Sequence, residues 1–156
     1  SWPAVAGGLG ANGNPGMVAA AKANPYSIAY IGVSFADQVA QAGLGQAELL
    51  NKAGNYVLPT EATISAAADS FANSTPADER VSMIFAPGAQ AYPIVNYEYA
   101  IINTHQASGA VAKAVREFLT WAITDGNSMS FLKKVHFMPL PPAVVELSKA
   151  QIAKIK

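Results

Sequence analysis

Hydrophobic residues recur at helical spacing in the stretch that leads up to Asp125–Asn127. The apolar positions are Val111, Val115, Phe118, Leu119 and Ala122. Polar side chains fall on the opposite side of the same stretch: Lys113, Arg116, Glu117, Thr120 and Thr124. This spacing predicts an amphipathic helix that buries its apolar face and ends near the turn residues Asp125–Asn127.

Other helices are predicted from start and stop signals. Asn14 is a suitable N-cap, Pro15 suits the first helical position, and Asn24 before Pro25 ends the segment. Further helices are expected over residues 33–42, 60–71 and 131–135, and a last helix carries an apolar stripe. The stripe consists of Val144, Val145, Ser148, Ile152 and Ile155.

Strand patterns alternate with these helices. Residues 28–31, 81–85 and 92–103 are expected strands, the last with Val95, Tyr97, Tyr99 and Ile101 on a core-facing side. Residues 49–50 and 56–58 flank Gly54-Asn55 and predict a β-hairpin. The alternation predicts the α/β class.

Composition narrows the function classes. The 156 residues are 51% hydrophobic and 13% charged, which indicates a folded domain, and ten basic residues balance ten acidic ones. The balance gives no support for a nucleic-acid or membrane-surface partner. There is no cysteine, and no apolar run reaches the ~18–20 residues that span a bilayer.

Short motifs in the chain do not predict an enzyme. Gly8 to Gly13 spells G-x-G-x-x-G, but the preceding Trp2-Pro3 is a poor strand and a helix starting at Pro15 leaves the last glycine outside it. His105 and His136 have no carboxylate at ligand spacing, so no metal site or cofactor is expected. Residues 78–80 form a charge run expected on a solvated surface.

Two helix starts could face an anion. The amides of Asn14, Gly16 and Met17 begin one helix, and Gly32 and Ser34 lie at the next strand-to-helix corner. The competing interpretation is an ordinary capped helix, which is the commoner arrangement.

Four segments together resemble the phosphate-binding receptors (PstS type) of bacterial ABC importers, nearly end to end and closest to the lipid-anchored form. They are Gly10–Val18, Ser27–Gly32, Tyr92–Tyr97 and Phe137–Pro141. The chain resembles the C-terminal half of such a receptor. The resemblance implies a type II periplasmic-binding-protein fold, an extracytoplasmic location, and partners that are phosphate, the permease and the N-terminal half.

The resemblance also implies how the chain is divided. Residues 1–92 would belong to the second lobe and residues 93–156 would return to the first, with a hinge at Tyr92, Pro93, Ile94 and Asn96. An Arg-x-Asp-x-Ser-Gly-Thr motif supplies most phosphate ligands in the family and does not occur in this chain. We therefore expect most ligands upstream, and weak binding and poor folding of this segment alone. The alternatives are a receptor for sulfate or molybdate, or a small α/β enzyme.

Overall fold

The computed structural model describes residues 5–156 of the chain. Two compact units make up the structure, Ser1–Gln46 and Ala47–Lys156. This boundary lies elsewhere than the expected lobe division after Tyr92, which stays a prediction.

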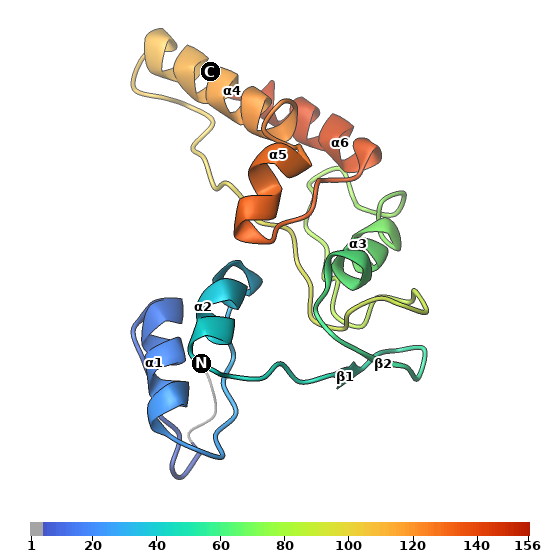
Figure 1. Cartoon of the computed structure of the whole chain (residues 1–156). Coiled ribbons are helices and arrows are strands. Elements are labelled where there is room, and N and C mark those ends of the chain that lie inside the picture. Colours follow the sequence, from blue (N-terminus) through green and yellow to red (C-terminus); the bar gives the residue numbers. More distant parts are fainter. Residues whose placement is uncertain (1–4) are drawn as a thin grey trace. The chain divides into compact units, whose positions relative to one another are not determined.

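The first unit contains α1 (Gly13–Ala23), a 3-10 turn η1 (Val33–Phe35) and α2 (Ala36–Gln41) (Figure 1). The predicted helices are therefore present, but α1 begins two residues early, with Asn12 rather than Asn14 as its N-cap. Pro15 falls within the first turn, where its missing N–H costs no hydrogen bond. Asn24 ends the helix, and its Nδ2 donates to the Ala20 carbonyl oxygen at 2.8 Å.

The strand expected at residues 28–31 is not formed. Ile28 is fully exposed and Tyr30 is 65% exposed, so these side chains have no core to cover. The prediction is wrong because a strand requires a hydrogen-bonded neighbour, and the described part of the chain offers none here. No strand occurs at Val5–Asn12 either, while Trp2 and Pro3 lie outside the described residues.

The second unit begins with the expected hairpin. Strands β1 (Leu49–Leu50) and β2 (Tyr56–Val57) are antiparallel, and Leu49 lies opposite Val57. Gly54 has φ +86°, a left-handed conformation that a side chain would strain. The hairpin prediction is confirmed.

Asn51 fixes the hairpin loop from a buried position, with 4% of its surface exposed. Its Oδ1 accepts hydrogen bonds from the amides of Ala53 and Asn55, each at 3.0 Å. Its Nδ2 donates to the carbonyl oxygens of Ala89 at 2.9 Å and Ala91 at 3.2 Å. One side chain therefore joins the hairpin to a loop about 40 residues further along.

Helix α3 (Glu61–Asp69) starts with a reciprocal cap between Thr60 and Thr63, in which each side chain accepts from the other residue's amide. Its buried residues are Ala67 and Ala68. They belong to two small cores. The first contains Ala68, Met83, Tyr97 and Val144, and the second contains Ala67, Ala86 and Ala91.

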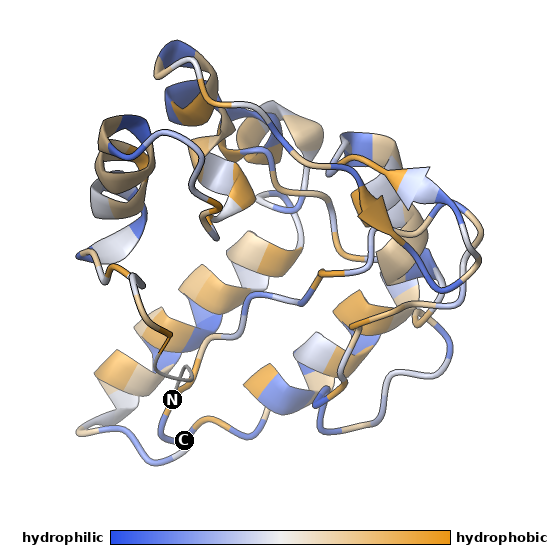
Figure 2. Cartoon of the chain, turned by 90° about the horizontal axis from the view of Figure 1, so that it is seen from below, coloured by the Kyte–Doolittle hydropathy of each residue, from blue (hydrophilic) through white to orange (hydrophobic). Residues whose placement is uncertain are grey.

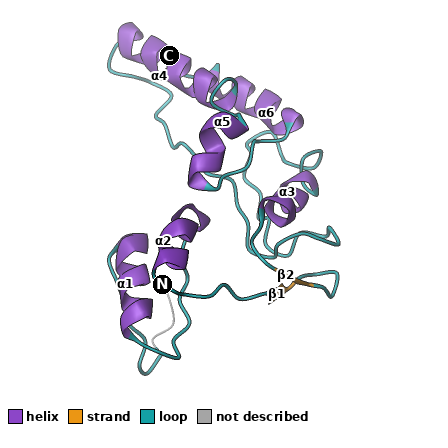
Figure 3. Ribbon diagram, in the orientation of Figure 1, coloured by secondary structure: helices purple, strands orange, loops and turns teal. Residues whose placement is uncertain are grey.

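The strands expected at residues 81–85 and 92–103 are wrong for the same reason as the first. Both segments are loops in Figure 3, and residues 94–103 make no backbone-to-backbone hydrogen bond with any described residue. Of the expected core-facing side, Tyr97 is buried, Tyr99 is 47% exposed and Ile101 is 95% exposed. The segment is extended and apolar but has no neighbouring strand.

The C-terminal helices are α4 (Gly109–Ile123), α5 (Met129–Leu132) with the 3-10 turn η2 (Lys133–Val135), and α6 (Pro142–Ile152). Ser108 caps α4 by accepting from the Val111 amide at 3.3 Å. Helices α4 and α6 lie side by side (Figure 1), so the predicted helices are confirmed.

The buried face of α4 differs from the prediction. Val111 is 42% exposed and Phe118 is 63% exposed, whereas Ala112 is buried. Arg116, expected on the polar side, donates from Nη1 to the Ile155 carbonyl oxygen at 2.7 Å. The C-terminal residues therefore cover a different side of α4, and apolar residues remain on helix surfaces (Figure 2).

Candidate functional site

The two predicted anion-facing corners meet each other in the first unit. The Gly32 amide donates to Asn14 Oδ1 at 2.8 Å, across eighteen residues of sequence. A Cβ added to Gly32 would lie 3.2 Å from Asn14 Nδ2, so the glycine permits this close approach. The contact connects α1 to the corner before η1, and it occupies the Gly32 amide, which is one of the donors that an anion site would use.

The early start of α1 changes which amides are free. In an α-helix that begins at Gly13, the amides of Gly16 and Met17 fall where they donate to carbonyl groups one turn back. The amides without an intrahelical acceptor are those of Gly13 and Asn14, since Pro15 has none. The Gly16 and Met17 amides are therefore less suited to contact an anion than the sequence suggested. The amides of Gly13 and Asn14 are the free donors at this helix start.

Ser34 lies in η1, directly after the Gly32 corner, and its side chain is half-buried. The Phe35 amide donates back to the Gly32 carbonyl oxygen at 3.0 Å, which closes the turn. Lys22 is the one basic residue of residues 1–46, and it lies in the last turn of α1, far from the helix start. Backbone dipoles are therefore the main source of positive potential at these corners.

The expected hinge residues are anchored at one end. The Tyr92 amide donates to the Thr63 carbonyl oxygen, and the Phe85 amide donates to the Pro93 carbonyl oxygen, both at 2.9 Å. Pro93 is buried, whereas Ile94 is 48% exposed. The anchoring contacts end at Pro93, so the backbone after it is the less constrained part of the segment.

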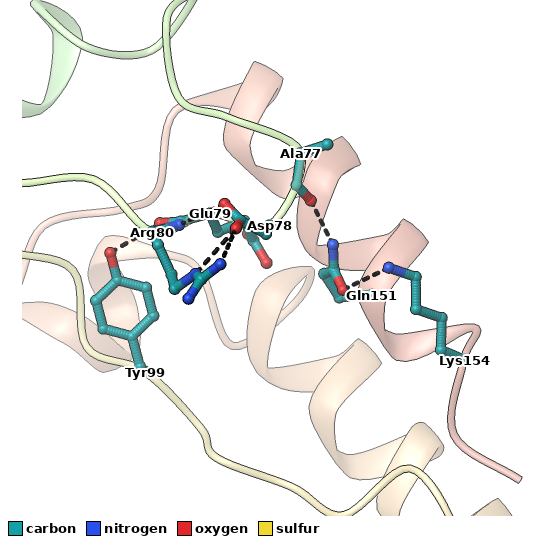
Figure 4. Close-up of polar contacts among 7 residues, drawn as sticks. All are labelled: Ala77, Asp78, Glu79, Arg80, Tyr99, Gln151 and Lys154. Carbon is teal, nitrogen blue, oxygen red and sulfur yellow. Dashed lines mark hydrogen bonds and ion pairs between the residues drawn. The ribbon is translucent and has the colours of Figure 1, made fainter.

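The charge run at residues 78–80 makes long-range contacts that the sequence did not indicate (Figure 4). The Glu79 carboxylate accepts from the Ser148 hydroxyl, and the Glu79 carbonyl oxygen accepts from the Tyr99 hydroxyl at 2.9 Å. Gln151 of α6 donates to the Ala77 carbonyl oxygen. The partners in these contacts lie up to 74 residues apart in the sequence. No local sequence pattern could therefore predict the contacts.

The rest of this run is solvated as expected. Arg80 pairs with Asp78 at 2.7 Å, and both side chains are at least half exposed. Hydrogen bonds from Arg80 lower the pKa of the Asp78 carboxyl below its usual value. Exposed pairs of this kind contribute little stability, so the ion pair shapes the turn rather than a binding site.

The described residues contain neither a metal-binding cluster nor a membrane-spanning helix. Within residues 5–156 there is no group of three or more side chains placed to hold a metal ion. An open hollow between α4 and α6 is lined by Arg116, Trp121 and Lys149 among others. None of the predicted anion-facing residues lines it. None of the helices in the described residues is long and apolar enough to span a membrane.

Comparison with known proteins gives consistent matches. A family model described as a PBP superfamily domain matches residues 1–126. Over its whole length, the chain is 34% identical to the phosphate-binding protein PstS of Methanocaldococcus jannaschii, and it covers 42% of that protein. It is also 28% identical to the phosphate-binding protein PstS of Xylella fastidiosa, in a match that covers 96% of this chain and 39% of that protein. Its identity to the phosphate-binding protein PstS of Pasteurella multocida is 29%, in a match that covers 96% of this chain and 41% of that protein. The chain thus spans about two fifths of the length of these curated relatives.

Proposed function

This chain belongs to the PBP superfamily, and we propose that it is part of an extracytoplasmic receptor that binds inorganic phosphate for an ABC importer. Membership confirms the predicted family resemblance and the α/β, periplasmic-binding-protein-like fold class. The observation that carries the proposal is the alignment of nearly the whole chain with three relatives that are named phosphate-binding proteins. Delivery to permease subunits and a lipid anchor on the outer face of the membrane are parts of the same proposal.

The alternatives have less support. None of the relatives described above is named for sulfate or molybdate, and their names describe binding proteins rather than enzymes. A receptor that recognises phosphate through an aspartate acceptor would reject fully ionised sulfate, because two negative groups without a shared proton repel.

We propose that most phosphate ligands come from outside this segment. The arginine-containing ligand motif is absent from the sequence, and the predicted corners at Asn14, Gly32 and Ser34 carry no basic side chain. Binding by charge-assisted donors is the strong mode for an oxyanion. We assign these corners a supporting role, in which the Asn14–Gly32 hydrogen bond positions the loops around the anion.

The exposed apolar surfaces support a second part of the proposal. Ile28, Ile101 and Phe118 are between 63% and 100% exposed, and residues 94–103 make no backbone-to-backbone hydrogen bond with any described residue. We propose that the rest of the receptor packs against these surfaces and supplies strands beside residues 28–31 and 94–103. Burying large apolar side chains of this kind contributes ~1.5–3 kcal/mol each.

Calorimetric titration with phosphate tests the function. The whole receptor should bind phosphate with micromolar or tighter affinity and reject sulfate and molybdate, whereas this 156-residue segment alone should bind weakly or not at all. If the whole receptor binds sulfate or molybdate more tightly than phosphate, the proposed substrate is wrong. Micromolar phosphate binding by the segment alone would contradict the assignment of the main ligands to the rest of the receptor.

The hinge is tested by structures of the receptor with and without phosphate. Because hydrogen bonds anchor Tyr92 and Pro93, the backbone change should concentrate at Ile94–Asn96 and at one partner strand. A change in φ and ψ confined to other segments would show that the chain pivots elsewhere.

A further inference from the structure

We propose that Asn12 is a modification site at which the side-chain amide converts spontaneously to a carboxylate. The inference concerns the chemistry of the α1 start and does not depend on the phosphate receptor proposed above. It rests on the sequence at Asn12–Gly13, on the exposure of Asn12, and on the absence of hydrogen bonds that would protect it.

The reaction requires the backbone nitrogen of the following residue. That nitrogen loses its proton to hydroxide and attacks Cγ of the asparagine, and the new C–N bond closes a cyclic imide. The side-chain nitrogen leaves as ammonia after taking up a proton. Water then opens the imide at either carbonyl and gives aspartate or isoaspartate. Water is the only co-reactant, and no atom changes its oxidation state.

Asn12–Gly13 is the only Asn-Gly pair in the sequence. Glycine has no Cβ to obstruct the approach of its nitrogen to the asparagine side chain. Gly13 has φ +65°, and the nearest atom to a Cβ built there is Pro15 Cδ at 3.7 Å. The backbone at this residue therefore has both conformational freedom and open space.

Neither reacting group is held by a hydrogen bond in residues 5–156. Asn12 is exposed, and its side chain makes no cap hydrogen bond to α1. The Gly13 amide lies at the first helical position, where an α-helix provides no acceptor. The Asn12 backbone has to rotate away from its ψ of 103° before the imide ring can close. Residues 5–11, which lead into it, lie in no helix or strand that would resist this rotation.

Other asparagines differ in ways that make them internal comparisons. Asn14 precedes a proline, which has no N–H to react, and its Oδ1 accepts from Gly32. Asn51 is buried with its amide fully hydrogen-bonded. Asn73 is the closest match, since it is exposed and no described residue bonds its side chain. It precedes Ser74, however, whose Cβ hinders the attack.

Peptide mapping by mass spectrometry tests the proposal on the folded receptor after incubation at mildly alkaline pH. The peptide containing Asn12 should gain the mass difference between an amide and an acid while the Asn73 peptide stays unchanged. Part of the product should accept a methyl group from isoaspartyl methyltransferase. An Asn12→Gln variant should lose both signals.

Two results would overturn the proposal. One is survival of the Asn12 amide for as long as the Asn73 amide, a comparison within the wild-type protein that requires no variant to fold. The other is an undiminished isoaspartate signal in Asn12→Gln, which would place the modification at a different residue. Circular dichroism before and after incubation ensures that the reaction is followed in the folded protein.

Discussion

Replacing Asn51 with alanine removes a buried side chain that makes four hydrogen bonds to the backbone. Two amides, of Ala53 and Asn55, lose their acceptor, and two carbonyl groups, of Ala89 and Ala91, lose a donor. At ~0.5–1.5 kcal/mol for each hydrogen bond, the sum is ~2–6 kcal/mol. The Ala89 oxygen keeps a second donor, Asn55 Nδ2 at 2.8 Å. Water can also reach the loop, so we expect Asn51→Ala to lower the free energy of unfolding by ~2–3 kcal/mol.

Hydrogen exchange in the folded protein measures this loss locally. The amides of Ala53 and Asn55 should exchange ~30–150-fold faster in Asn51→Ala, because every 1.4 kcal/mol changes an equilibrium about tenfold. Asn55→Ala is the matched control, since it removes one exposed hydrogen bond from the same loop. It should lower stability by less than about 1 kcal/mol. Equal exchange rates at Ala53 in the wild type and in Asn51→Ala would refute the reasoning that Asn51 holds the hairpin loop.

Further substitutions, at Gly88, Thr60 and Tyr97 and at two control positions, have expected outcomes in thermal or urea unfolding of the protein. Gly88→Ala places a Cβ 2.7 Å from Ser70 Oγ and should cost ~1–3 kcal/mol. Adding Ser70→Ala to Gly88→Ala should recover part of that loss. Gly45→Ala should leave stability nearly unchanged, because no atom lies within 4 Å of a Cβ built at Gly45. Thr60→Ala should cost ~0.5–2 kcal/mol through loss of the α3 cap, and Thr60→Ser should cost clearly less; equal losses would contradict the cap. Tyr97→Phe should be neutral or stabilising by about 1 kcal/mol, because the buried hydroxyl makes no well-formed hydrogen bond to a described residue. Burial raises the pKa of the Tyr97 phenol above its ordinary value. The wild type should therefore lose stability as the pH rises through that raised pKa, and Tyr97→Phe should lose less; identical alkaline profiles would refute this.

Local signals in the sequence predicted the helices well. The capping residue Thr60 and the turn glycine Gly54 act on neighbours a few residues away, so their effects can be deduced from sequence. The α1 start was displaced because Asn12 and Asn14 are both suitable caps. Asn14 instead forms a hydrogen bond to Gly32, which lies eighteen residues away, and only the folded chain reveals that choice.

Strands were predicted less well because their formation depends on a partner segment. The alternating pattern at Val95–Ile101 is a real amphipathic pattern, yet it yields a loop without a neighbouring strand. The contacts of Glu79 with Ser148 and Tyr99 are equally non-local. The candidate site could be predicted as two corners, but their direct contact and the shift of the free amides to Gly13 and Asn14 required the structure.

The unpaired segment Ile94–Asn103 has a practical consequence for handling this polypeptide. Apolar backbone whose N–H groups and most of whose C=O groups have no partner among the described residues is a template for pairing with another molecule. The formal net charge of the chain is zero, so long-range repulsion between copies does not oppose such pairing. Aggregation during expression or storage should therefore begin at this segment. In this segment on its own, Ile101 is 95% exposed, so Ile101→Lys should keep the isolated polypeptide in solution without disturbing the buried Tyr97.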